Sequence, residues 1–377
     1  MMRSTVVSVA LFSLVMPLSA QTQVGGNGAF LYEKYSFDAG LSYTDVSEVT
    51  VPLTFSTHFG NRTLFTLSTG ATQVSLTGDP DVGLQDQEIS GIIDTEARLV
   101  IDLVPDRVSF LVTGVLPTGM EALEIEEEAV LTALSSQVIG FSTTRLGGGG
   151  RAGAGIVGAF PVGEMALGLA GTYTYSAGYS PLADNTAEWQ PGGEIRIRAG
   201  LEGTVAPRSY LRVAAIFAAR QPDKMDGIEQ GEVGNQFHVY ASLNQGIQSS
   251  SLSLYMFDSY RSAPQIESTT IGTVLLPKGN LLALGAKLEL PLARGTALVP
   301  KAEYRKLTEA SRDGVGDGGL EAAGSTFRIG ADLKHSLNPN WAVVVEGNGL
   351  FGDVGAGDGS TIGVSGFRGG LHLEFRR

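Results

Sequence analysis

The sequence of 377 residues contains no cysteine and four histidines. The lack of cysteine excludes disulfide scaffolds, thiolate metal sites, cysteine nucleophiles and a lipid anchor on an N-terminal cysteine. Charged residues are also scarce, at 17% against a usual share of about a quarter. Lys and Arg number 26 against 39 Asp and Glu. Without a basic excess to neutralise phosphates, we expect no nucleic acid partner.

Motifs for catalysis and cofactor binding are weak or missing. Gly148, Gly150 and Gly153 satisfy G-x-G-x-x-G, but the residues that follow have strand spacing rather than helix spacing, so nucleotide binding is not expected. The histidines are scattered without metal-ligand spacing, and His238 with Ser242 has no identifiable carboxylate partner for hydrolysis. The sequence therefore predicts no enzyme, no cofactor and no metal site.

Long apolar runs are also missing. No run of roughly 18 apolar residues occurs beyond the N-terminus, so no transmembrane helix is expected. Residues 1–20 combine a positive charge at Arg3, a short apolar stretch, and small residues at Ser19 and Ala20. This order is typical of a secretory signal peptide cleaved after Ala20, and a buried first helix is the alternative. We therefore expect an exported protein.

Alternation of apolar and polar residues is what the sequence has in abundance. It runs through residues 96–104 and returns in GEIRIRAGLEGT, QFHVYASLN, TFRIGADLK and the final segment. A period of two predicts strands with one apolar and one polar face. A soluble sandwich alternates in the same way, so alternation alone does not place the apolar face in lipid.

The lengths of the connections favour a membrane barrel. Short connections at 105–106, 161–163, 205–207, 245–247, 293–295 and 336–339 alternate with long segments at 117–149, 176–192, 221–234, 259–280, 308–323 and 352–361. This asymmetry indicates tight periplasmic turns on one rim and long external loops on the other. Trp341 and Phe351 share one face of a predicted strand, at a spacing that fits the two edges of an apolar band about 25 Å tall.

The predicted fold is all-β: a transmembrane antiparallel β-barrel of about 16 strands, with about 14 as the alternative. Residues 1–20 are the predicted signal peptide, 21–35 a periplasmic segment, and 36–377 the barrel, beginning with a strand at 36–43. The expected location is the outer membrane of a diderm bacterium. The expected partners there are lipids, lipopolysaccharide and the barrel-insertion machinery, whose C-terminal signal the ending at Phe375 resembles. The oligomeric state is left open.

Most ionisable side chains on the predicted strands share the face opposite the apolar one. They line either a wet channel or a narrow lumen that they close by pairing. We favour the channel, because about sixteen strands form a barrel too wide for side chains alone to fill. The predicted lining residues are Glu96, Arg98, Asp102, Arg107, Glu194, Arg196, Arg198, Glu202, Arg212, Lys287, Glu289, Lys301, Glu303, Arg305, Arg328, Asp332, Glu346, Arg368 and Glu374.

Residues 121–139 depart from the period of two. Apolar positions at spacings of three and four predict a helical stripe there. The segment either folds into the mouth and narrows it or remains outside as a cap or a mobile loop. If it folds inward, its acids would face basic wall positions, with Arg196, Arg198 and Arg212 the nearest candidates. The candidate constriction residues are Glu124, Glu126, Glu127, Glu128, Val130, Leu131 and Leu134.

Two patches carry a family resemblance. VSFLVTGVLPTG at 108–119, preceded by GLQDQEISGIIDTEARLVIDL, resembles the outer-membrane barrel family associated with phenol meta-pathway degradation, including P-T-G at Pro117–Gly119. WQPGGEIRIRAGLE at 189–202 is similar to a strand start in such barrels. The resemblance implies passive uptake of small, often apolar molecules. The expected function is thus a passive channel for small solutes, apolar or aromatic ones included; the alternative is a non-conducting surface barrel for binding or envelope structure.

Overall fold

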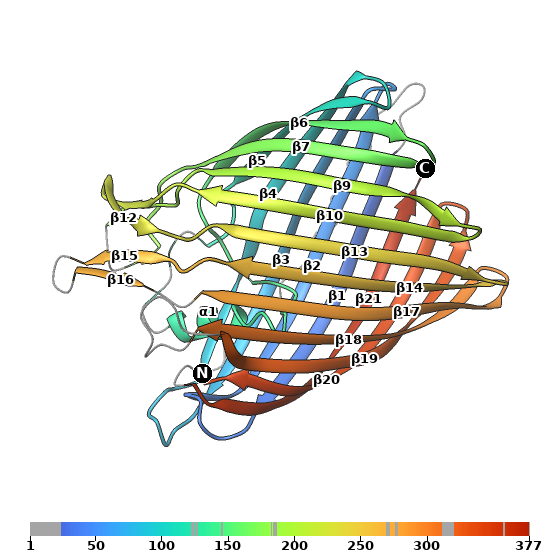
Figure 1. The fold of residues 1–377 in the computed structure, drawn as a ribbon. Coiled ribbons are helices and arrows are strands. Elements are labelled where there is room, and N and C mark those ends of the chain that lie inside the picture. The colour runs from blue at the N-terminus through green and yellow to red at the C-terminus, as the bar shows by residue number, and fades with distance from the viewer. Residues whose placement is uncertain are drawn as a thin grey trace.

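The computed structural model describes residues 24–376 apart from 121, 123, 125, 126, 145, 182, 184–186, 269–271, 276, 277, 311–319, 357 and 358. Within that part, sixteen strands form one closed antiparallel barrel (Figure 1), which confirms the predicted fold class. The predicted signal peptide lies outside the described residues. The barrel strands are β1 (Val24–Phe37), β2 (Tyr43–Phe59), β3 (Thr63–Gly78), β4 (Gln87–Val104), β5 (Val108–Leu116), β6 (Arg151–Val162), β7 (Met165–Ser176), β9 (Glu194–Ala206), β10 (Ser209–Arg220), β13 (Gln236–Ile247), β14 (Ser250–Arg261), β17 (Gly279–Ala293), β18 (Thr296–Ala310), β19 (Leu320–Asn338), β20 (Trp341–Gly355) and β21 (Thr361–Arg376).

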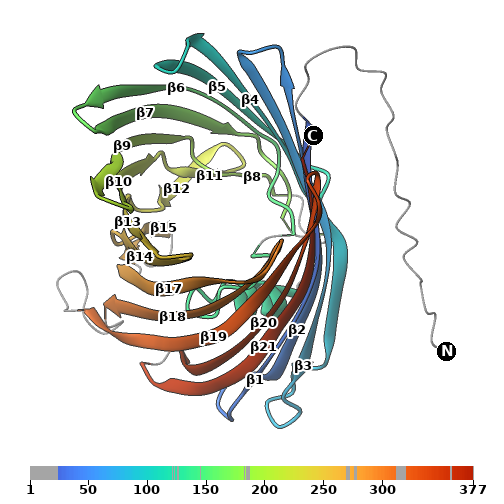
Figure 2. The same ribbon diagram turned by 90° about the vertical axis from the view of Figure 1, so that its right-hand side faces the viewer.

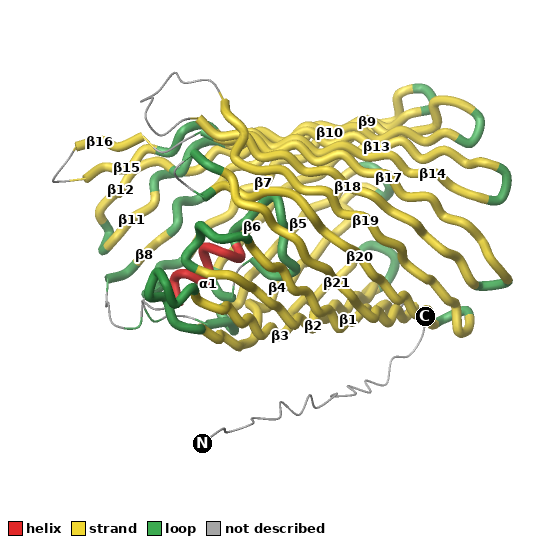
Figure 3. The backbone as a smooth tube through the Cα atoms, turned by 90° about the horizontal axis from the view of Figure 1, so that it is seen from below, coloured by secondary structure: helices red, strands yellow, loops and turns green. Residues whose placement is uncertain are grey.

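The two rims differ as the sequence predicts. One, the turn rim, carries the connections 60–62, 105–107, 163–164, 207–208, 248–249, 294–295 and 339–340, together with both chain ends. Several of these turns have positive φ, such as Asp106 at 57° and Gly163 at 62°, as tight hairpins require. The other, the loop rim, carries the longer connections (Figure 3). Since β1 pairs with β21, the sheet has no free edge around the barrel.

The N-terminal boundary was predicted wrongly. Residues 24–35 are not a separate segment: they belong to β1, which pairs with both β2 and β21. The strand predicted at 36–43 does not exist, because β1 ends at Phe37 and β2 begins at Tyr43. Both faces of β1 carry aromatic rings. Tyr32 contacts Phe367 outside, with ring centroids 5.6 Å apart, and Tyr35 is buried inside. Because apolar rings occur on both faces, the sequence of β1 does not show the apolar–polar alternation that predicts a strand.

The outer face of the barrel is apolar. Large side chains on strands around the whole circumference are between 43% and 57% exposed, among them Phe30, Phe55, Ile156, Ile197, Phe217, Phe327 and Leu371. Trp341 and Phe351 lie on this face near opposite ends of β20, and each contacts a neighbouring ring. A continuous apolar band of this kind suits hydrocarbon rather than water. No helix in the described residues is long and apolar enough to cross a membrane.

A second, smaller sheet stands on the loop rim beyond β9, β10, β13 and β14 (Figures 1 and 3). It comprises β8 (Trp189–Gln190), β11 (Asp223–Met225), β12 (Ile228–Glu232), β15 (Gln265–Ser268) and β16 (Gly272–Leu275), in the order β16-β15-β12-β11-β8. Its strands come from three successive long connections, so these loops extend the wall on one side of the mouth.

Candidate functional site

The connection between β5 and β6 enters the barrel. Figure 2 looks along the barrel and shows its helix α1 (Glu128–Leu134) inside the ring of strands. Val130 and Leu134 of this helix are fully buried, and Val138 and Ile139, which follow the helix, are at most 2% exposed. They pack in one apolar cluster with inward side chains of β1, β2, β3, β4, β20 and β21: Tyr35, Phe37, Val46, Val74, Leu76, Ile89, Leu350, Val354, Ile362 and Val364. The loop therefore covers this side of the inner wall.

The helix is shorter than the predicted stretch 121–139. It ends at Leu134, and from Ser135 onward the chain bends away from helical pairing. The bend frees backbone carbonyls that then accept hydrogen bonds from the wall. The four bonds are Arg305 Nη1 to Gln137 O at 3.2 Å, Thr326 Oγ1 to Val138 O at 2.6 Å, Arg328 Nη2 to Ile139 O at 2.7 Å and Arg368 Nη2 to Gly140 O at 2.8 Å. Four successive carbonyls thus tie the loop to β18, β19 and β21.

A buried carboxylate completes this attachment. Glu33 on β1 is 0% exposed; it receives Nε and Nη2 of Arg368 at 3.0 and 2.7 Å and the backbone N–H of Ser142 at 2.7 Å. The hydroxyl of Tyr35 also donates to it at 2.7 Å. Glu33 therefore links the loop to both the first and the last strand. We call Glu33, Arg328, Arg368 and the segment 137–142 the loop latch.

A second carboxylate lies beside the loop latch. Glu48, 1% exposed, is directly opposite Glu33 in the β1–β2 register. Thr50 donates to one oxygen of Glu48, and Thr50 is in turn 3.2 Å from Thr143 of the loop. The other oxygen, Oε2, is buried without a hydrogen-bond partner in the described residues. Two adjacent buried carboxylates make the nearby arginines essential, because an unpaired buried charge is strongly destabilising.

Replacing Arg368 by Gln is expected to loosen the loop latch. The change leaves Glu33 buried without its cation, which costs about 3–5 kcal/mol for a buried pair, and it removes the bond to Gly140 O. We expect the loop to become sensitive to protease in detergent while the barrel remains folded. Arg376→Gln is the matched control, since it removes the same charge from the same strand at an 83% exposed side chain. Equal protease resistance in both variants would show that Arg368 does not hold the loop.

The P-T-G segment forms the stem of the loop. The backbone N–H of Thr95 donates to Thr118 Oγ1 at 2.9 Å, and Gly119 N donates to Asp94 Oδ1 at 3.0 Å. A side chain on Gly119 would collide with the carbonyl oxygen of Leu146 on the returning strand of the stem. Glycine is therefore required where the chain turns from the end of β5 into the barrel.

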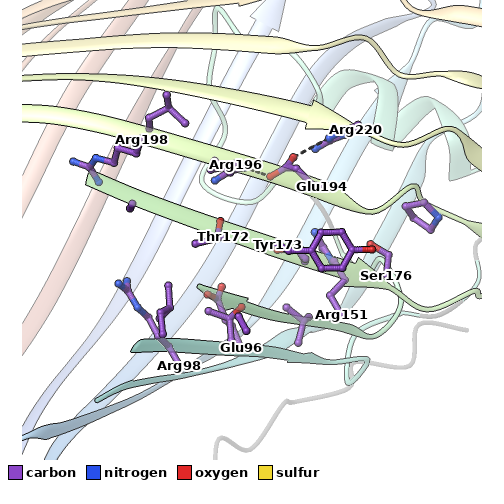
Figure 4. Close-up of a pocket in the computed structure, with 18 of the residues that line it drawn as sticks. Glu96, Arg98, Arg151, Thr172, Tyr173, Ser176, Glu194, Arg196, Arg198 and Arg220 are labelled. Atoms are coloured by element: carbon purple, nitrogen blue, oxygen red, sulfur yellow. Dashed lines mark hydrogen bonds and ion pairs between the residues drawn. The ribbon is translucent and has the colours of Figure 1, made fainter. Parts of the chain in front are cut away.

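The other half of the lumen stays open. A cavity of about 1210 Å³ lies between the loop and the inner wall formed by β4–β7, β9 and β10. Glycine, alanine and threonine occupy most inner positions of β6 and β7, which leaves room there (Figure 4). The charged residues lining it are Glu96, Arg98, Arg151, Glu194, Arg196, Arg198, Glu202, Arg212, Arg220, Asp223 and, from the loop, Glu124.

Half of these arginines are neutralised by the wall itself. Glu194 pairs with Arg196 at 2.6 Å and with Arg220 at 2.9 Å, and Glu202 pairs with Arg212 at 2.6 Å. Arg98, Arg151 and Arg198 have no carboxylate within ion-pair distance in the described part of the chain. Arg198 is on β9, Arg151 on β6 and Arg98 on β4, so these three cations come from different strands of the same wall (Figure 4).

All of the predicted lining residues except Arg107 lie on the inner face of the barrel. Strand register places Glu96, Arg98, Asp102, Glu194, Arg196, Arg198, Glu202, Arg212, Lys287, Glu289, Lys301, Glu303, Arg305, Arg328, Asp332, Glu346, Arg368 and Glu374 on the inner face. Arg107 is not on that face but in the exposed turn between β4 and β5. Among the inner ones, Arg305, Arg328 and Arg368 bind the loop. Others pair along the wall, such as Lys301 with Asp332 at 2.6 Å and Glu346 at 3.1 Å.

The loop candidates also separate. Val130 and Leu134 face the wall, whereas Glu124 and Leu131 line the cavity. Glu127 accepts the backbone N–H of Glu124 at 3.0 Å. Glu126 and the side chain of Glu128 lie outside the described residues. The arginines that hold the loop are Arg305, Arg328 and Arg368, and their acceptors are backbone carbonyls. Arg196, Arg198 and Arg212, predicted to face the acids of the loop, line the same cavity as Glu124.

The sequence reading missed Glu33, Glu48 and Arg151. Glu33 falls in the segment 21–35 predicted to precede the barrel, and Glu48 and Arg151 lie at the starts of predicted strands. The signal that could have found Glu33 is its place in an alternating stretch whose neighbours Leu31 and Tyr35 share its face.

No family model matches the chain, and no curated protein matches it. In fold it is similar to OccAB3 of Acinetobacter baumannii, at 11% identity and a TM-score of 0.49, with 94% of this chain and 99% of that one covered. It is also similar to the outer-membrane protein OpdK of Pseudomonas aeruginosa, at 10% identity and 0.45, covering 95% and 98%. A third similar structure is OmpF of Salmonella typhi, at 12% and 0.43, covering 94% and 97%.

Proposed function

We propose that this protein is a passive channel of the outer membrane of a diderm bacterium, through which small solutes diffuse. The observation that carries the proposal is the open half of the lumen: the loop fills one side and leaves a cavity of about 1210 Å³ on the other. Pockets that enclose a drug-sized ligand reach about 1,000 Å³. A small solute therefore fits beside the loop together with part of its hydration shell.

The orientation follows from the rims. Short turns and both chain ends belong at the periplasmic side, and the longer connections face outward. The apolar outer face then contacts lipid and the loop rim contacts lipopolysaccharide. The end of β21 at Phe375 is the part that the insertion machinery would read. The signal peptide at 1–20 supplies export.

The class of solute is a finer proposal. The P-T-G segment and its preceding strand resemble the phenol meta-pathway barrels, which favours small apolar or aromatic molecules. Apolar side chains of the loop, Met120 and Leu131, line the cavity and provide a surface for such molecules. Their presence supports uptake of solutes that are not purely hydrophilic.

Planar bilayer recording tests the channel. Protein purified from outer membranes should migrate differently on a gel before and after boiling, as intact barrels do, and should give discrete conductance steps. Heat-modifiable protein that never gives steps would favour the alternative, a non-conducting surface barrel. The feature that favours this alternative is the small sheet on the loop rim, which presents backbone edges where an external partner could bind.

A further inference from the structure

The three unpaired arginines of the cavity require an explanation. Arg98, Arg151 and Arg198 line the same cavity, and none has a carboxylate partner in the described residues, although Glu194 and Glu202 pair with other arginines nearby. The Nε atom of Arg151 is buried with no hydrogen-bond partner among those residues. Guanidinium groups left unpaired in a lumen are donors available to an anion.

The side of the cavity that the loop forms carries apolar side chains. The loop contributes Met120 and Leu131 to the lining, whereas Leu146 is 2% exposed and belongs to the buried cluster. Leu146 and the backbone of the stem are held in place by the bond from Met120 N to Leu146 O at 3.2 Å. A solute crossing this cavity therefore has guanidinium groups on the wall side and a fixed apolar surface on the loop side.

We propose that the cavity binds small organic carboxylates with an apolar body. The carboxylate pairs with one of the guanidinium groups of Arg98, Arg151 and Arg198 at a time, and the body packs against the apolar residues of the loop. This proposal rests on the proposed channel function and names its solute class. Planar carboxylates match the fork of the guanidinium group, which a neutral amide of the same shape does not.

The acids in the cavity are compatible with this site. Glu194 and Glu202 are occupied by ion pairs, and Asp223 accepts the backbone N–H of Gly192 at 2.7 Å. Glu96 is the inner-face residue of β4 next to Arg98, on the side of the loop rim. Negative charge there and at Glu124 disfavours anions carrying more than one charge and keeps the dwell time of a monoanion short. Weak binding is what conduction requires, since a solute must leave as well as enter.

The experiment compares three probes in bilayers containing the full-length channel. Benzoate has the charge and the ring, benzamide has the ring without the charge, and acetate has the charge without the ring. We expect benzoate to interrupt the potassium chloride current at the lowest concentration. In the double variant Arg98→Gln/Arg198→Gln, block by benzoate should weaken by about tenfold or more, as expected for loss of charge-assisted hydrogen bonds.

The matched control is Arg294→Gln, which removes one positive charge in the exposed turn between β17 and β18. Block by benzoate should be unchanged there. Benzamide blocking as strongly as benzoate in the unaltered protein, or equal block in the double variant and the control, overturns the anion site. Acetate blocking as strongly as benzoate overturns the role of the apolar loop surface. In each of these cases the channel itself still conducts, whereas absence of any current contradicts the proposed function instead.

Discussion

Deletion of residues 121–139 is expected to raise single-channel conductance severalfold. The deletion removes α1 and the residues that follow it, which occupy the side of the lumen against β1–β4 and β18–β21. Residues 140–145 remain as a link across the stem, whose ends are already hydrogen-bonded between Met120 N and Leu146 O. Water should then fill the vacated space, because Arg305 and Arg328 lose their carbonyl acceptors at Gln137 and Ile139 and need new ones.

The control for this deletion is a second deletion, made in a connection that lies outside the barrel. Removing residues 266–274 deletes the β15–β16 hairpin and joins Gln265 to Leu275, which are already neighbours across it. Conductance should not change, since this hairpin stands on the loop rim (Figure 1). Both deletions should preserve heat modifiability. A conductance that stays constant after removal of 121–139 would falsify the loop as the constriction and leave only the wall charges to determine selectivity.

The strands were predictable because their pattern is local. A period of two in GEIRIRAGLEGT predicts both the strand and its faces. In the structure Arg196 and Arg198 are on the inner face, and Ile195 and Ile197 are exposed on the outer face. The rule breaks in β1, where the inner face near the loop rim carries Tyr35 and Phe37 in place of polar residues. Aromatic rings are tolerated on this inner face because the loop packs over them. The sequence of β1 alone does not reveal that contact.

The direction of the loop could not be predicted for the same reason. Its helical stripe fits an inward or an outward helix equally well, since Val130 and Leu134 need only some apolar surface. The choice depends on partners distant in sequence. Gly140 meets Arg368, and Glu33 meets both Arg368 and Ser142. No short-range spacing encodes contacts of this kind, so only the closed barrel brings them together.

Replacing Gly168 by Phe is expected to reduce conductance severalfold and to leave the barrel intact. Gly168 is on the inner face of β7 and lines the open half of the lumen. A side chain added there would meet only the carbonyl oxygen of Gly200, at 3.9 Å, so the ring would project into the cavity without strain. It would occupy part of the cavity that solutes are proposed to cross.

Gly171→Phe on the same strand is the matched control. Gly171 pairs with Ile156 and Ile197, which are 56% and 57% exposed on the outer face, and an added side chain meets nothing within 4 Å. The two variants therefore add the same ring, three positions apart, to opposite faces of one strand. Conductance should fall in the first and stay unchanged in the second, with the same mobility shift on heating. If both conduct like the unaltered protein, solutes do not pass along β7, and the path lies elsewhere in the lumen.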